Sequence, residues 1–262
     1  IGLLFLWVYM LKINSTQNSL IKKISLLSNR KDIILQNQCF VEGGKIIIEL
    51  INNYFTVKTI LVSTDKLEDF LPKVKNFKGE IIEINKIVAD KISNTVNSAG
   101  IFALVELPKT KNFNKDDKYI VLDNIQDPTN LGSVIRSALA FNYKQIILIN
   151  CVYLYLPKVI RSSMGYALNA NFYMFSENEF VSFAKVNNLN LICGHLSGED
   201  LLNFKADNIN YGIVIGNEGN GVSNNISNIC QTLIKIPIND NVESLNAAVS
   251  AAILMFYLNN KG

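Results

Sequence analysis

The stretch YIVLDNIQDPTNLGSVIRSALAF, residues 119–141, decides the fold. An apolar run, Tyr119–Leu122, predicts a buried strand, and Leu131–Phe141 has the pattern of a helix. The alternation continues downstream with apolar runs at Gln145–Ile149, Leu189–Ile192, Tyr211–Ile215 and Leu233–Ile236, between helix-like segments at Lys158–Leu168, Glu177–Val186 and Glu243–Leu258. This pattern predicts an open parallel sheet with helices on both faces. Such sheets bind ligands at the carboxyl ends of their strands, so we expect chemistry in the loops after Leu122, Ile215 and Ile236.

The N-terminal half predicts a separate small α/β domain at residues 14–107. It contains a helical stretch, Glu42–Asn53, and three apolar patches, Thr59–Val62, Glu80–Ile84 and Ile101–Val105. Residues 108–118 are polar, begin with a proline and lack periodicity, which indicates a linker before a domain at residues 119–262. Residues 1–13 form an apolar leader or a fragment end. Their apolar run is too short to span a bilayer, so we expect no membrane partner.

The composition excludes several classes of protein. With 49% hydrophobic and 18% charged residues the chain is not globally disordered, and a formal charge of +3 permits an anionic partner without requiring one. The four cysteines are isolated, which argues against zinc sites and disulfide frameworks. His195 is the only histidine, so we expect no metal site built from histidines. A buried or surface role for His195 is the simpler interpretation.

The loop after Leu122 reads DNIQDPTN, followed by a helix that carries Arg136. Either Asp127 or Thr129 can cap that helix, which leaves the backbone N–H groups of Asn130 and Gly132 available to an anion. Arg136 follows Asn130 by less than two helical turns, so both can face one cleft. On spacing alone, an ordinary turn with a solvated arginine explains the same residues.

The loop after Ile215 reads GNEGNGVS, with glycines at 216, 219 and 221. Glycines allow close backbone approach to a flat or charged ligand. The spacing differs from the dinucleotide fingerprint G-x-G-x-x-G, which disfavours a nicotinamide-dependent oxidoreductase. The chain has no P-loop motif, which disfavours a nucleoside triphosphatase. Glu218 is not needed for a simple turn.

The loop after Ile236 reads PINDNVESLN and leads into a helix rich in alanine. Asn241 or Ser244 can cap this helix, whose first turn would then carry Ser244 and Asn246. Small residues along the helix predict close packing against another backbone.

In this order and spacing, the three loops resemble the signature motifs of the SpoU (TrmH-type) RNA 2′-O-ribose methyltransferases of the SPOUT superfamily. The family pattern is D-P-x-N-x-G-x-x-x-R, then G-x-E-G-x-G, then I-P-[MI]-x-x-x-x-x-S-L-N. The N-terminal half is similar to the family's substrate-binding domain through Phe40–Gly43 and Gly100–Ala103. The resemblance covers nearly the whole chain after its first dozen residues.

The resemblance implies a deep trefoil knot in the C-terminal sheet, formed with the second and third loops. It implies S-adenosylmethionine as cofactor, with adenine held near Gly216, Ile236 and Leu245 and with Asn217 and Gly219 beside it. The implied reaction methylates a ribose 2′-OH. Its implied site residues are Arg136, Asn130, Glu218, Ser244 and Asn246. Arg161 resembles a further family segment on the RNA side, although a surface arginine explains it equally well.

The family also implies a homodimer that acts on RNA, rRNA in preference to tRNA because of the additional N-terminal domain. Lys22, Lys23, Lys31 and Lys45 are candidate phosphate contacts there. The expected location is the bacterial cytoplasm, with an organelle as the alternative. A competing interpretation is an inactive RNA-binding or ribosome-assembly module on the same fold. Retention of Asn130, Arg136, Glu218 and Asn246 argues against it.

Overall fold

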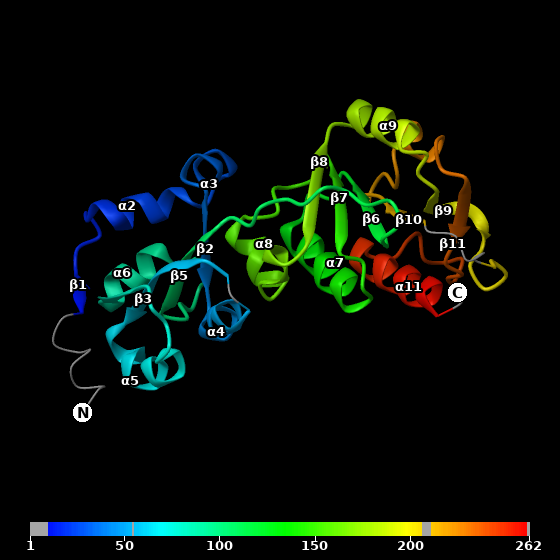
Figure 1. Cartoon of the computed structure of the whole chain (residues 1–262). Helices are drawn as coiled ribbons and strands as arrows, with labels where there is room; N and C mark the ends of the chain where they lie inside the picture. The colour runs from blue at the N-terminus through cyan, green and yellow to red at the C-terminus, as the bar shows by residue number, and fades with distance from the viewer. Residues whose placement is uncertain (1–9, 54, 206–210, 261–262) are drawn as a thin grey trace. The chain divides into compact units, whose positions relative to one another are not determined.

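The computed structural model describes residues 10–53, 55–205 and 211–260. The chain forms two compact units (Figure 1). Unit 1 draws on residues 1–108 and 155–168, and unit 2 on residues 109–154 and 169–262. A short segment of the C-terminal half therefore clusters with the N-terminal half. None of the helices in the described residues is long and apolar enough to cross a membrane.

Unit 1 contains a mixed five-stranded sheet in the order β1-β4-β3-β5-β2, in which β5 is antiparallel to both of its neighbours. The strands are β1 (Leu11–Ile13), β2 (Gln38–Glu42), β3 (Val57–Ser63), β4 (Glu80–Ile84) and β5 (Ile101–Glu106). The helices are α2 (Ser19–Leu26), α3 (Arg30–Gln36), α4 (Gly44–Asn52), α5 (Leu67–Phe70), α6 (Lys86–Ile92) and α8 (Pro157–Ser162), with 3-10 turns η1 (Thr64–Lys66), η2 (Leu71–Val74) and η3 (Tyr166–Leu168).

The predicted strands of unit 1 are confirmed as β3, β4 and β5. The predicted helix at Glu42–Asn53 is confirmed as α4, but it starts later, because Glu42 ends β2 and Gly43 turns the chain with φ 118°. Strands β1 and β2 were not predicted from the sequence. Helix α8 packs against β2, which explains why residues 155–168 belong to this unit.

Unit 2 contains a six-stranded sheet in the order β11-β9-β10-β6-β7-β8, and every neighbouring pair is parallel. The strands are β6 (Tyr119–Asp123), β7 (Gln145–Ile149), β8 (Asn171–Phe175), β9 (Leu191–Asp200), β10 (Gly212–Ile215) and β11 (Thr232–Lys235). The helices are α7 (Pro128–Ala140), α9 (Glu177–Val186), α10 (Asn224–Ser227) and α11 (Ala247–Asn259). The predicted parallel sheet is confirmed, while β8 and α10 were not predicted.

The strand order places the ends of β6 and β10 side by side. Ile215 at the end of β10 pairs with Leu122 near the end of β6. The chain leaves β6 toward β7 and β8 on one side, whereas β10 and β9 lie on the other. This reversal is the point at which open α/β sheets bind ligands. The loops after β6 and β10 therefore meet at one edge of the sheet.

Strand β9 is interrupted where it pairs with β11. Leu233 pairs with Cys193, but the next residue, Ile234, pairs with Glu199, so residues 194–198 bulge out of the ladder. A Cβ on Gly198 would lie 2.5 Å from the backbone nitrogen of Ile234. Only glycine permits this close approach of the two backbones. The bulge brings residues 194–198 to the same edge of the sheet as the loop after β10.

The segment predicted as a linker packs on unit 2. The Phe113 ring lies 5.3 Å from that of Tyr119 and 5.2 Å from that of Phe183, centroid to centroid. The buried Gln145 side chain accepts from the Asn114 N–H at 2.8 Å and donates to the Asn114 carbonyl at 2.6 Å. These bonds satisfy the buried amide.

Candidate active site

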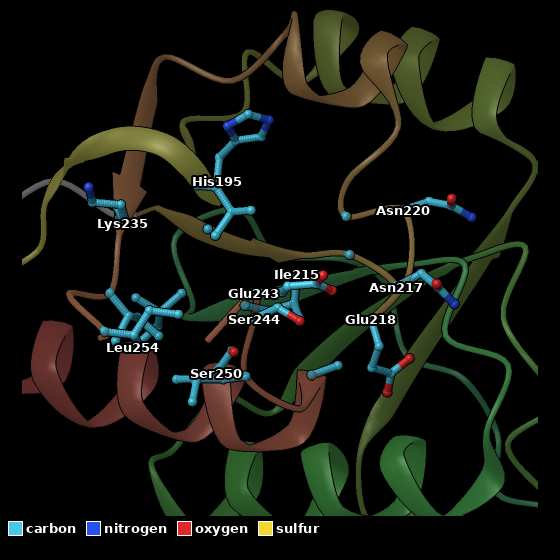
Figure 2. A pocket seen from close by; sticks show the side chains of 18 of the residues that line it. His195, Ile215, Asn217, Glu218, Asn220, Lys235, Glu243, Ser244, Ser250 and Leu254 are labelled. Atoms are coloured by element: carbon cyan, nitrogen blue, oxygen red, sulfur yellow. The ribbon is translucent and has the colours of Figure 1, made fainter. Parts of the chain in front are cut away.

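A pocket of about 400 Å³ opens at the carboxyl edge of the unit 2 sheet. Its walls come from three segments: the bulge in β9, the loop after β10, and the loop between β11 and α11. Figure 2 shows polar side chains around an apolar floor that includes Ile215 and Leu254. A pocket of this size with an apolar lining and a polar rim suits a nucleoside-sized ligand.

The loop after β6 is fixed by its N-cap. The Asp127 carboxylate accepts from the N–H groups of Thr129 at 2.7 Å and Asn130 at 2.9 Å, which identifies Asp127 as the cap of α7. The expectation that the Asn130 N–H stays available to an anion is wrong, because Asp127 already occupies it. The cap instead holds Asn130 in the first turn, with its side chain on the pocket side of the helix.

The loop after β10 folds back on itself. Asn217 and Gly221 exchange two backbone hydrogen bonds, of 3.0 and 2.9 Å, and the Asn217 side chain accepts from the Gly219 N–H at 2.8 Å. The chain therefore passes very close to Gly216, where a Cβ would lie 2.1 Å from the Gly221 carbonyl carbon. Gly216 is required for steric reasons.

The loop after β11 ends at a cap that differs from the prediction. Asn246 is the N-cap of α11, and its Oδ1 accepts from the N–H groups of Ala248 at 2.9 Å and Val249 at 3.3 Å. Neither Asn241 nor Ser244 caps the helix, and both Ser244 and Asn246 precede its first turn. Several polar residues precede α11, and only packing selects which of them becomes its N-cap.

A chain of side-chain hydrogen bonds connects all three loops. Asn246 Nδ2 donates to Asn130 Oδ1 at 3.0 Å, and Asn130 Nδ2 donates to Glu218 Oε1. Each amide uses its oxygen and its nitrogen, so both orientations are determined by their partners. Asn130 lies more than 80 positions in sequence from both Glu218 and Asn246, and the three are held in a single polar network.

Two further contacts anchor the network to the sheet. The Ser223 N–H donates to the buried Asp123 carboxylate at 2.7 Å, which ties the loop after β10 to the end of β6. Cys151 Sγ donates to the Leu122 carbonyl at 3.2 Å and accepts from the Ile125 N–H. Burial raises the pKa of the Cys151 thiol to about 12, so the thiol remains a neutral hydrogen-bond partner near pH 7.

Most predicted site residues converge. Seven line the pocket: Gly216, Asn217, Glu218, Gly219, Ile236, Ser244 and Leu245. Asn130 lies beside the pocket through its bond to Glu218, and Asn246 through its bond to Asn130. Arg136 is different: it is exposed on α7, does not line the pocket, and forms no ion pair with the described part of the chain. Asn130 and Arg136 are thus not brought into one cleft within a single chain.

The pocket wall formed by the β9 bulge was not predicted from the sequence. Gly194, His195 and Leu196 line the pocket, and the His195 ring accepts from the Ser197 N–H at 3.2 Å through Nδ1. Two glycines, Gly194 and Gly198, bracket this stretch. Their spacing was the one available signal, since glycine inside a strand often marks a bulge.

Comparison with known proteins now identifies the family. The model of the SpoU rRNA Methylase family matches residues 117–256, and a model described as the MRM3-like substrate binding domain matches residues 18–103. The chain belongs to the SpoU rRNA methylase family. The matched ranges cover most of unit 2, including all the residues that line its pocket, and most of unit 1.

Individual relatives agree with the family. The 23S rRNA (guanosine(2553)-2′-O)-methyltransferase RlmP of Bacillus subtilis is 25% identical over 95% of this chain and 99% of its own length. A crystal structure of an RNA 2′-O ribose methyltransferase superposes with a TM-score of 0.83 at 27% identity, covering 96% of this chain and 99% of that one. The AdoMet-bound rRNA methyltransferase from Sinorhizobium meliloti shares the fold, with a TM-score of 0.82 at 22% identity over 94% and 96% of the two chains.

Membership of the SpoU family confirms the predicted reaction class. The chain is an RNA methyltransferase that uses S-adenosylmethionine and methylates a ribose 2′-OH. The pocket fits this cofactor, because apolar side chains and glycine backbone suit a nucleoside, while carboxylates and amides at the rim suit a positively charged sulfonium and an ammonium group.

The close approach at Gly216 gives a direct test of the pocket. In Gly216→Ala the new methyl collides with backbone, so the loop must shift; we expect the Kd for S-adenosylmethionine, measured by isothermal titration calorimetry, to rise about tenfold. Gly219→Ala is the matched comparison, because its Cβ would meet only Asn217 Oδ1 at 3.4 Å. An equal or larger loss in Gly219→Ala would show that the close backbone approach at Gly216 does not set the affinity.

Proposed function

We propose that this enzyme methylates a ribose 2′-OH of rRNA at the rim of the unit 2 pocket. The observation that carries the proposal is the hydrogen-bonded network of Asn130, Glu218 and Asn246 beside that pocket. S-adenosylmethionine, when bound, supplies a methyl group on a positively charged sulfur. Gly216, Asn217, Gly219, Ile236 and Leu245 are the residues that we assign to holding it.

The network suits the positioning of a ribose. Among the described residues, Glu218 Oε2 accepts no hydrogen bond, so this oxygen can take one from a sugar hydroxyl. The Ser244 side chain is exposed at the pocket mouth and offers a second hydroxyl. Asn130 and Asn246 act as positioning residues that keep Glu218 in one orientation. Alignment of this kind provides much of the rate in transfer reactions.

Arg136 supplies a positive charge, which the network of Asn130, Glu218 and Asn246 lacks. A guanidinium carries only N–H donors and no acceptor, so we assign Arg136 to binding an RNA phosphate and stabilising the developing 2′-oxyanion. The proton would then pass to an RNA phosphate oxygen, or to the carboxylate that the cofactor would supply when bound. This assignment requires a planar, two-pronged donor, which lysine does not provide.

The reaction is tested by transfer of labelled methyl from S-adenosylmethionine to purified rRNA and, separately, to tRNA. We expect label from rRNA to appear in alkali-resistant dinucleotides, since a 2′-O-methyl group blocks hydrolysis. Arg136→Ala should lower the rate about a hundredfold, because it removes the oxyanion's donor. Arg136→Lys should also be strongly impaired.

The control for the loss of a positive charge is Lys185→Ala, because Lys185 is an exposed residue on α9. Near wild-type transfer by Arg136→Lys would contradict the two-pronged role of Arg136. Absence of transfer to either RNA, with RNA binding intact, would instead identify an inactive RNA-binding module.

A homodimer explains why Arg136 lies outside the pocket of its own chain. Helix α11 is apolar on all faces, and its outer face leaves Val249 48% and Phe256 58% exposed. Exposed apolar residues of this kind favour a self-complementary interface. We assign this face, next to α7 in the same unit, to a two-fold contact that brings Arg136 toward the partner's pocket.

Co-expression of two defective chains tests this arrangement. Arg136→Ala lacks the guanidinium, and Gly216→Val lacks the pocket. If Arg136 serves the partner's pocket, mixed dimers contain one intact site, and the mixture should recover about a quarter of wild-type activity. If Arg136 serves its own chain, the mixture stays as inactive as each variant alone.

Phe256→Glu should shift the sedimentation velocity to that of a monomer.

We also propose that the C-terminal segment forms a trefoil knot. Support comes from the path of the chain, which leaves the edge strand β11 and returns to pack α11 against α7 and β10 in the middle of unit 2. The preference for rRNA is supported by the relative RlmP and by the match of unit 1 to a substrate-binding domain. Bacterial relatives support action in a bacterial cytoplasm.

A further inference from the structure

Unit 1 buries a carboxylate that the reaction does not use. Glu42, the last residue of β2, is only 5% exposed. Its carboxylate accepts hydrogen bonds from the Asn94 N–H at 3.0 Å and the Ala99 N–H at 3.3 Å. Burying a carboxylate is costly unless hydrogen bonds replace the lost water, and these bonds do so. Its bonds all go to one segment, residues 93–99, between α6 and β5.

The inward side chains of this segment are hydroxyls. Ser93 Oγ donates to Glu42 Oε1 at 2.7 Å, and Thr95 Oγ1 lies 3.0 Å from the same oxygen. Residues 93–99 contain no helix or strand, so their conformation depends on these bonds. The segment is therefore ordered by the Glu42 carboxylate together with bonds of its own, such as that from Thr95 Oγ1 to the Asn97 carbonyl at 2.8 Å.

The outward side chains are two amides and one apolar group. Asn94 and Asn97 are exposed, and their side-chain amides form no hydrogen bond with the described residues. Val96 between them is completely exposed, with a relative accessibility of 103%. The loop therefore presents to solvent, side by side, one apolar side chain and two amides without a partner among the described residues, and binding residues are often carried on such loops.

We propose that residues 93–99, the Glu42 loop, contact unpaired bases of the RNA substrate, with Glu42 as the positioning residue. The inference rests on the proposed function, and it names a surface of unit 1 that reads the RNA. Asn94 and Asn97 donate to and accept from base edges, and Val96 packs on a base face. Recognition of RNA by sequence uses unstacked bases and contacts of this kind.

The charge of the loop favours RNA as its partner. Residues 93–99 carry no charged side chain, and the one nearby carboxylate is buried under them. Lysines flank the loop: Lys91 is exposed in the last turn of α6, and the side chain of Lys66, which also forms an ion pair with Asp65, lies against Gly100. A neutral polar centre between cations suits bases between phosphates.

Equilibrium filter binding of the full chain to protein-free 23S rRNA tests the loop. Val96→Ala and Asn97→Ala should each raise the Kd about fivefold, and the double variant more, because contacts to a base are lost. Matched controls are Leu35→Ala on α3, which is 76% exposed, and Asn52→Ala at the end of α4. Their Kd should equal that of wild type.

Glu42→Gln tests the positioning role. We expect faster hydrogen exchange at the Asn94 and Ala99 amides and a weaker affinity for rRNA, while the Kd for S-adenosylmethionine in unit 2 stays unchanged. Val96→Ala and Asn97→Ala alter only exposed side chains, so they report on the loop even if Glu42→Gln unfolds unit 1.

The outcomes separate this proposal from the proposed function. If wild type binds and methylates rRNA but the loop variants bind like the controls, the Glu42 loop does not contact RNA, and a protein partner becomes its explanation. If wild type binds rRNA and transfers no methyl group, the proposed function fails. The Kd values of the loop variants for rRNA would still show whether the Glu42 loop contacts RNA. Wild type that does not bind rRNA overturns the loop assignment.

Discussion

The amide of Asn130 is the contact on which the site depends. It donates to Glu218 in the loop after β10 and accepts from Asn246 at the start of α11. A single side chain thus fixes three segments that come from distant parts of the sequence. The bond to Glu218 is partly buried, and leaving such a partner unpaired costs more than the bond itself contributes, so the loops that carry Asn130 and Glu218 adopt their geometry together.

The sheet makes this contact possible. Because β10 pairs with β6, their loops emerge at the same edge, and the reversal in strand order leaves space between them. The bulge in β9 and the return of the chain from β11 to α11 then close the pocket. Steric constraints complete the arrangement: backbone approaches at Gly198 and Gly216 leave no room for a side chain. Figure 2 shows the resulting polar rim, with Asn217 and Glu218 on neighbouring positions of one loop.

Much of unit 2 was predictable because its strands are continuous apolar runs. Helix ends were predicted less well: Asp127 was one of two candidate caps, whereas Asn246 was not among those considered for α11. In both places several adjacent residues have the right chemistry, and tertiary contacts choose between them. The wall around His195 was missed because a bulge depends on the partner strand. The role of Glu42 was also hidden, since its partners lie more than 50 positions away.

The position of Arg136 is a further limit of sequence spacing. Six residues along a helix separate it from Asn130 by about 240° of rotation, so the two side chains leave α7 on different faces. Spacing therefore correctly placed both residues on one helix without placing them in one cleft. An exposed arginine and an apolar outer face on the neighbouring helix α11 are explained together if the functional unit contains two chains.

The most direct test of the central claim is a double-mutant cycle between Asn130 and Asn246 in single-turnover methyl transfer to rRNA. If the two amides act through one network that positions Glu218, the double alanine variant should lose little more rate than the more damaging single variant. Losses of free energy that simply add would show that Asn130 and Asn246 act independently, and would contradict the network as the feature that organises the site.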